Sequence, residues 1–156
     1  MAKLGIALLL AIVCFSLIVT VIYYNWQCEK DTVAWLYRAQ VASNPEDMEE
    51  YLEHCLTGME KWQGTTGHAA IIFKTPENDM QLISRALNRS IQRCRQVKEF
   101  DPKSVEYQTA LDDLRGQIRE LDLHMAYKWW ISGPQILLPL LTVIFGVAAL
   151  YWFYQE

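Results

Sequence analysis

The chain has 156 residues, of which 52% are hydrophobic and 21% charged, and its formal net charge is −4. Between residues 29 and 128 lie 13 of the 14 basic and 17 of the 18 acidic side chains. Both ends are therefore nearly uncharged, which is not typical of a soluble monomeric domain. The acidic balance of the middle also argues against a nucleic-acid-binding protein.

The first uncharged segment, residues 4–24, is long enough to cross a bilayer as a helix, since about 20 apolar residues suffice. A cleaved signal peptide is the alternative, because Met-Ala-Lys also suits a short basic leader. The apolar run of a signal peptide is usually shorter and ends in small residues. This one ends in Tyr23, Tyr24, Asn25 and Trp26, a composition typical of a membrane interface. We predict a short tail over 1–3 and a retained transmembrane helix over 4–26.

A second uncharged segment runs from Trp129 to Gln155. Trp129 and Trp130 precede its apolar stretch, and four aromatic residues close it at 151–154, so both ends carry the rings that favour the headgroup region. The segment predicts a transmembrane helix over 131–154 and a tail over 155–156. Pro139 is expected to cause at most a kink there. Neither predicted span contains Asp, Glu, Lys, Arg or His, which argues against transport through this chain alone.

Between the spans, residues 27–128 predict a small helical bundle. Capping residues precede proline at Asn44-Pro45, Thr75-Pro76 and Asp101-Pro102, and each pair marks a helix start. Apolar residues then recur at intervals of three and four, as expected for helices that pack along a seam. The predicted helices cover about 29–42, 45–62, 76–98 and 102–130. The fold class is thus an all-α membrane protein, with two transmembrane helices flanking a bundle whose last two helices form an antiparallel hairpin.

A row of arginines, Arg85, Arg89 and Arg93, lies on one face of the third predicted helix because its members are four residues apart. Three interpretations compete: pairing with the acidic helix 45–62 or with another subunit, binding of anionic lipid or nucleic acid, and a solvated face. Nucleic acid is disfavoured because aromatic residues are not interleaved with the row. We predict that this row, together with Trp129 and Trp130, contacts the partners of the protein.

Two carboxylate–histidine pairs, Glu50 with His54 and Glu120 with His124, are each one helical turn apart. Such pairs hold metals in helical bundles. Their spacing differs from the usual di-iron pattern, and the apolar seams use the neighbouring positions. We keep these four residues as candidate ligands, but predict no metal, no cofactor and no catalytic residue.

The four cysteines contain no C-x-x-C pair. If the bundle faces an oxidising compartment, Cys28 and Cys55 form the favoured disulfide, because a descending second helix would bring residue 55 near the membrane while Cys94 stays near the distal turn. The sequon Asn88-Arg89-Ser90 lies within a predicted helix, which argues against its use.

The topology and the function follow from this layout. Lys3 and the amino terminus favour cytoplasmic termini with the bundle outside; basic residues in the loop point the other way, but loops beyond about 60 residues translocate largely regardless of charge. We expect a non-catalytic accessory subunit of a larger integral-membrane complex, with the lipid bilayer and other subunits, or further copies of itself, as partners. The alternatives are a two-span sensor, which would lack an output domain, and a metal-dependent enzyme built on the four candidate ligands.

Overall fold

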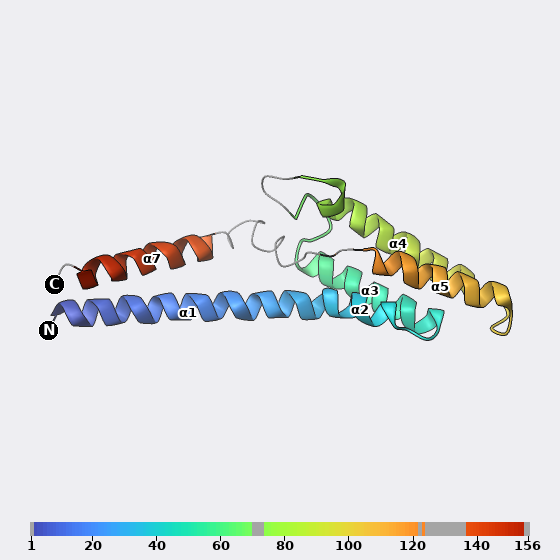
Figure 1. Cartoon of the computed structure of the whole chain (residues 1–156), viewed down its shortest axis with the longest axis horizontal. Coiled ribbons are helices and arrows are strands. Elements are labelled where there is room, and N and C mark those ends of the chain that lie inside the picture. Colours follow the sequence, from blue (N-terminus) through green and yellow to red (C-terminus); the bar gives the residue numbers. More distant parts are fainter. Residues whose placement is uncertain (1, 70–73, 122, 124–136, 155–156) are drawn as a thin grey trace. The chain divides into compact units, whose positions relative to one another are not determined.

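The computed structural model is mostly helical, and its described residues contain no strand. The chain divides into two units, one made of Met1–Gln27 with Trp130–Glu156 and one made of Cys28–Trp129. Figure 1 shows the helices coloured along the chain. The all-α class is therefore confirmed. The structure describes residues 2–69, 74–121, 123 and 137–154.

The first unit contains most of α1 (Ala2–Asp31) and all of α7 (Leu137–Tyr154). One helical stretch of the described chain, Ala11–Gln40, is long and apolar enough to cross a bilayer by length and composition. Large apolar side chains along α1 are exposed, including Phe15 at 69% and Ile22 at 62%. A helix that is apolar on all sides requires an apolar medium around it.

The helix α7 is described from Leu137 to Tyr154, within the second predicted span, and residues 131–136 of that span lie outside the described residues. Pro139 lies within α7, and the expectation of at most a kink there stays a prediction.

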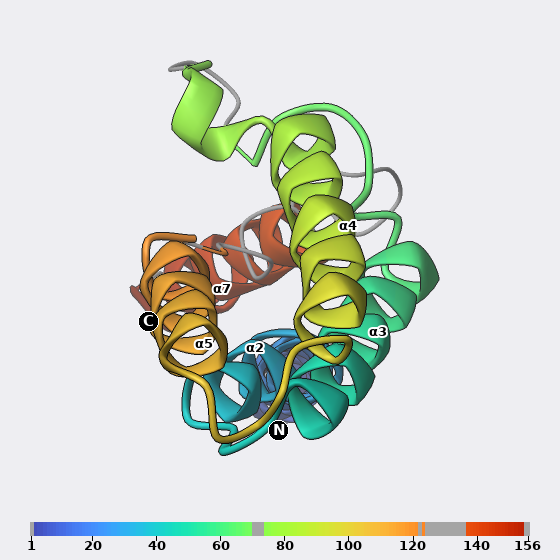
Figure 2. The same ribbon diagram turned by 90° about the vertical axis from the view of Figure 1, so that its right-hand side faces the viewer.

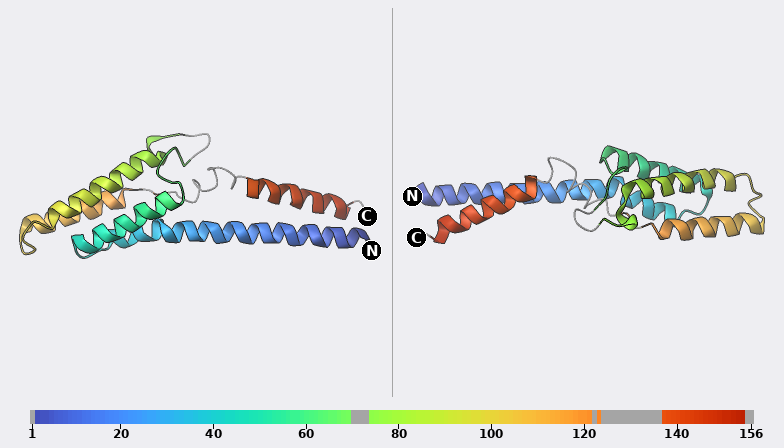
Figure 3. Two further views of the ribbon diagram at one scale, coloured as in Figure 1. Left: turned by 180° about the vertical axis from the view of Figure 1, so that it is seen from behind. Right: turned by 90° about the horizontal axis from the view of Figure 1, so that it is seen from above.

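The second unit is a ring of helices around one core. In it, α2 contacts α3 and α5, and α4 also contacts α3 and α5 (Figure 2). The predicted antiparallel hairpin is formed by α4 and α5, which lie side by side and are joined by a short loop (Figure 3). The helices are α2 (Val33–Gln40), α3 (Pro45–Lys61), α4 (Met80–Val97) and α5 (Val105–Arg119). The largest fully buried side chains include Leu36, Met48, Leu52, Met59, Leu87, Leu111, Leu114 and Ile118.

One of the three predicted helix starts is confirmed and two are displaced. The side chain of Asn44 accepts a hydrogen bond from the backbone N–H of Asp47 at 2.7 Å, and α3 begins with Pro45 as predicted. The helix predicted from residue 76 instead opens with a short 3-10 turn, η1 (Pro76–Asn78). The helix α4 starts only after Asp79, whose carboxylate accepts from the backbone N–H of Gln81 at 2.9 Å.

Backbone pairing explains why α4 starts late. The N–H of Ala69 donates to the carbonyl of Asn78 at 2.7 Å, and the N–H of Met80 donates to the carbonyl of Gly67 at 2.8 Å. These two hydrogen bonds flank an isolated bridge between His68 and Asp79, and they hold Asp79 extended. A continuous helix from residue 76 is incompatible with that conformation.

The helix predicted over 102–130 is shorter at both ends. Asp101 accepts a hydrogen bond from the N–H of Lys103 at 3.0 Å in a turn, and Ser104 caps α5 instead by accepting from the N–H of Tyr107 at 3.1 Å. At the other end α5 stops at Arg119. In a continued helix, Leu123 would lie on the side opposite Leu121 and so away from the apolar seam. Leu123 is nevertheless buried. The predicted extension toward residue 130 is therefore wrong at Glu120–Leu121, and residues 124–130 lie outside the described residues.

The first bundle helix was also predicted with the wrong limits. Residues 29–31 belong to α1, which continues past the predicted span because no glycine or proline interrupts residues 24–31. The break comes at Thr32, which is fully buried and donates its hydroxyl hydrogen to the carbonyl of Cys28 at 2.7 Å. The helix α2 then ends at Gln40, two residues before the predicted end.

A close approach between α3 and the end of α1 fixes this junction. A Cβ atom placed on Gly58 would lie 1.8 Å from the carbonyl oxygen of Asp31, so only glycine fits. The Asp31 carboxylate accepts hydrogen bonds from Lys61 Nζ at 2.6 Å and from Trp62 Nε1 at 3.0 Å. The last turn of α1 is thus held against the C-terminal half of α3.

Replacing Gly58 with alanine is expected to lower the stability of the bundle. The added methyl group meets backbone, which cannot rotate away, so a loss of about 1–3 kcal/mol is expected from overpacking. Thermal unfolding of the full chain in detergent, followed by circular dichroism, measures it. The matched control is Gly116→Ala in α5, where nothing lies within 4 Å of the new Cβ. This control should be stabilised by about 0.5–1 kcal/mol. Equal responses of the two variants would contradict the close approach.

Candidate interaction surface

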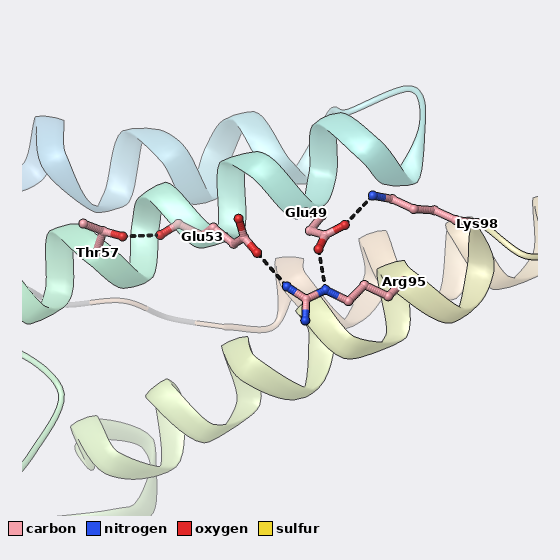
Figure 4. Close-up of polar contacts among 5 residues, drawn as sticks. All are labelled: Glu49, Glu53, Thr57, Arg95 and Lys98. Atoms are coloured by element: carbon pink, nitrogen blue, oxygen red, sulfur yellow. Dashed lines mark hydrogen bonds and ion pairs between the residues drawn. The ribbon is translucent and has the colours of Figure 1, made fainter.

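An ion-pair cluster joins α3 to α4. The carboxylate of Glu49 on α3 accepts hydrogen bonds from Arg95 and Lys98 on α4, and Arg95 Nη2 also donates to Glu53 Oε1 at 2.8 Å (Figure 4). The Glu49 side chain is only 12% exposed, whereas that of Arg95 is 58% exposed. Burial alone would raise the pKa of Glu49, but the hydrogen bonds from Lys98 and Arg95 outweigh it and lower the pKa.

The arginine row does not pair with the acidic helix, which was one of the interpretations that the sequence left open. Within the bundle, Glu49 and Glu53 are paired with Arg95 and Lys98 instead. Helical geometry explains the difference, because Arg95 lies at the edge of the buried seam of α4 that faces α3, while the row lies on the far side of that seam. Pairing with the acidic helix is therefore made by Arg95 and Lys98, which lie outside the row.

The three arginines of the row have different surroundings. Arg93 turns toward α5, and its Nη2 donates to Asp113 Oδ2 at 2.6 Å. Arg85 and Arg89 are exposed, and neither forms an ion pair with any residue that the structure describes. Two positive charges thus remain on the outer face of α4.

A half-open groove of about 430 Å³ lies between α4 and α5; Arg89 and Arg93 line it, and Arg85 lies one helical turn before Arg89. Asp113 accepts a second hydrogen bond here, from Gln117 Nε2 at 3.1 Å. The groove lining therefore combines guanidinium groups, side-chain amides and apolar side chains. Its lining includes Ala86, Arg89, Gln92, Gln96, Gln117 and Leu121.

The candidate metal ligands do not converge in the described part of the chain. His54 Nε2 lies 3.7 Å from Glu50 Oε1, and the imidazole stacks on the ring of Trp35 with 4.5 Å between centroids. No group of three or more histidine, cysteine or acidic side chains suited to a metal occurs among the described residues. Glu120 is exposed at the end of α5, and His124 lies outside the described residues.

The predicted disulfide is not formed in the structure. Cys28 and Cys55 are free and fully buried, as is Cys94. Burial raises the pKa of the Cys55 thiol to about 12. Because the thiolate is the species that attacks in disulfide exchange, burial of this kind suppresses bond formation in the folded state.

The two predicted tryptophans cannot be placed, and the Gly58 junction was not predicted. Trp129 and Trp130 lie outside the described residues. The contact of Gly58 with Asp31 was not anticipated, although a glycine inside a helical pattern often indicates a packing constraint. The ion pair of Asp31 with Lys61 joins residues far apart in sequence, and no local pattern marks it.

The chain matches no protein-family model, and comparison with curated proteins and with solved structures finds no match. Its function is therefore inferred from its own residues.

Neutralising Glu49 should weaken the bundle in a pH-dependent way. The folded-state pKa of Glu49 is lowered, so its stabilising effect is present above the unfolded pKa and is lost as the pH falls through the folded pKa. Glu49→Gln should therefore cost about 1–2 kcal/mol at pH 7. The difference from wild type should shrink below about pH 5 and vanish in stronger acid.

Melting curves of the full chain in detergent between pH 3 and pH 7 give this comparison. Glu60→Gln is the control, because Glu60 is an exposed carboxylate on the same helix whose side chain forms no ion pair within the described structure. A wild-type advantage over Glu49→Gln that stays constant across this range would refute the assigned role of the Glu49 charge.

Proposed function

We propose that this chain is a non-catalytic subunit of a larger membrane-protein complex, anchored by two transmembrane helices and docked through its helical bundle. The observation that carries the proposal is the outer face of α4. The cluster of Glu49, Arg95 and Lys98 pairs charges within the bundle, whereas Arg85 and Arg89, on another face of the same helix, have no ion pair in the described structure. Exposed arginines beside a groove suit a contact with another molecule.

The membrane anchor is supported by the composition and exposure of α1 and α7. Exposed apolar side chains run along α1, and α7 has 18 residues without a charged group. Each helix would gain free energy from transfer into lipid, and backbone polar groups within a helix are already hydrogen-bonded. With two spans, both termini lie on one side of the membrane and the bundle lies on the other. Lys3 favours the cytoplasm for the termini.

The non-catalytic part of the proposal is supported by the character of the groove and of the candidate ligands. The groove is lined by arginine and glutamine side chains together with small and apolar residues. Glu50 and His54 form a pair, and no group of three or more histidine, cysteine or acidic side chains suited to a metal occurs among the described residues. Such side chains suit recognition better than proton transfer or metal binding.

The two-span topology predicts where reporters will be found. An epitope tag placed before Met1 and another after Glu156 should be detected on the same side of sealed membrane vesicles. A third tag inserted next to Lys103, in the exposed turn between α4 and α5, should be detected on the opposite side. Tags on the two termini that resolve to opposite sides would contradict the second span.

Purification tests the subunit assignment. The full chain, extracted from its native membranes in a gentle detergent, should migrate with other membrane proteins in fixed stoichiometry. Mass spectrometry of the comigrating bands identifies them, and a detergent that dissociates complexes serves as the control. Recovery of a lone monomer or homo-oligomer from native membranes would overturn the proposed function.

A further inference from the structure

The outer surface of the α4–α5 hairpin holds groups that the packing of the bundle does not use. Arg85 and Arg89 are exposed and have no ion pair within the described structure, while Arg93 is already paired with Asp113. The groove beside them adds amide groups from both helices. We propose that this groove docks an acidic helix of a partner protein, one that carries carboxylates four residues apart. The inference rests on the proposed function, and it names the kind of partner segment that would bind.

The spacing of the unpaired arginines fits a helical ligand. Arg85 and Arg89 are one turn apart on α4, which separates their positions by about 6 Å along the helix axis. Carboxylates at positions i and i+4 of a second helix have the same separation. Two charge-assisted hydrogen bonds can therefore form together when the helices lie side by side.

The amide groups extend the match along the groove. Gln92 and Gln96 are also four residues apart on α4, and Gln117 stands on α5 at the other wall. Each amide can donate and accept, so the row suits polar side chains that continue the acidic stripe. Leu121 and Ala86 add apolar atoms to the same lining. Charged, polar and apolar groups in one groove suit the binding of an amphipathic helix.

Charge favours a protein ligand over a lipid surface. Adsorption to anionic lipid typically requires a cluster of four to eight basic residues. On this face of α4 two arginines have no ion pair within the described structure, which is fewer than such adsorption requires but matches two carboxylates of one helix.

Site-specific photocrosslinking in native membranes tests the proposal. The full chain carries p-benzoyl-phenylalanine in place of Gln92 in the groove. In the control, the same residue replaces Gln108, which is exposed on α5 outside the groove lining. After irradiation, mass spectrometry maps the crosslinked peptide. The expected adduct at position 92 is a partner helix with acidic residues at i and i+4, and no such adduct should form at position 108.

The second part of the experiment repeats the crosslinking with charge-reversal variants. Arg85→Glu with Arg89→Glu should reduce the adduct at position 92 by about tenfold, because carboxylates would then face carboxylates. Arg119→Glu makes the same kind of change on α5, and it lies two residues after Gln117 and so on the other side of that helix. This control should leave the adduct unchanged. Because all three arginines are exposed, neither variant should shift the melting temperature by more than about 2 °C.

The remaining outcomes separate the two proposals. A lipid adduct, a peptide without an acidic stripe, or no adduct at position 92 while the complex still copurifies would overturn the acidic-helix proposal and leave the proposed function intact. An adduct that persists after charge reversal would also overturn it. Failure of the wild-type chain to copurify with any partner would remove both.

Discussion

The bundle depends on the contact between α3 and the last turn of α1. At Gly58 the two backbones approach so closely that a Cβ atom would overlap the carbonyl of Asp31, and the Asp31 carboxylate accepts hydrogen bonds from Lys61 and Trp62 beside it. Thr32 is buried at the same place and redirects the chain into α2. This junction sets the position from which α2 begins its contacts with α3 and α5, and it joins an apolar helix directly to a charged bundle.

The basic residues of α4 fall into two groups, one that forms ion pairs within the chain and one that does not. One edge of the helix carries Arg95 and Lys98, whose partners Glu49 and Glu53 lie within the chain. The opposite surface carries Arg85 and Arg89, which the described bundle does not neutralise. Retaining exposed positive charges in an acidic chain contributes little to folding, since surface ion pairs are weak in any case. Such charges contribute more when a partner desolvates them, which is the basis for treating this face as a docking surface.

Patterns local in sequence predicted much of the fold. The three- and four-residue spacing of apolar side chains identified the bundle core and the α4–α5 hairpin, because helical periodicity is a property of neighbouring residues. The start of α3 at Pro45 followed from Asn44 in the same way. Where distant segments interact, the predictions failed: Gly67 and Ala69 delay the start of α4, and the burial of Leu123 accompanies the early end of α5. Whether the arginine row pairs within the chain was left open by the sequence; among the described residues only Arg93 of the row forms an ion pair, because another edge of α4 meets α3.

Chemical labelling of arginine tests most directly whether the chain is docked through this face. Phenylglyoxal modification of Arg89 would be compared between native membranes and the purified chain in neutral-lipid nanodiscs, with Arg119 as the internal reference. If the chain is docked through this face, Arg89 is protected severalfold in native membranes and becomes reactive on purification, while Arg119 reacts equally in both. Equal reactivity of Arg89 in the two preparations would show that this face is not docked.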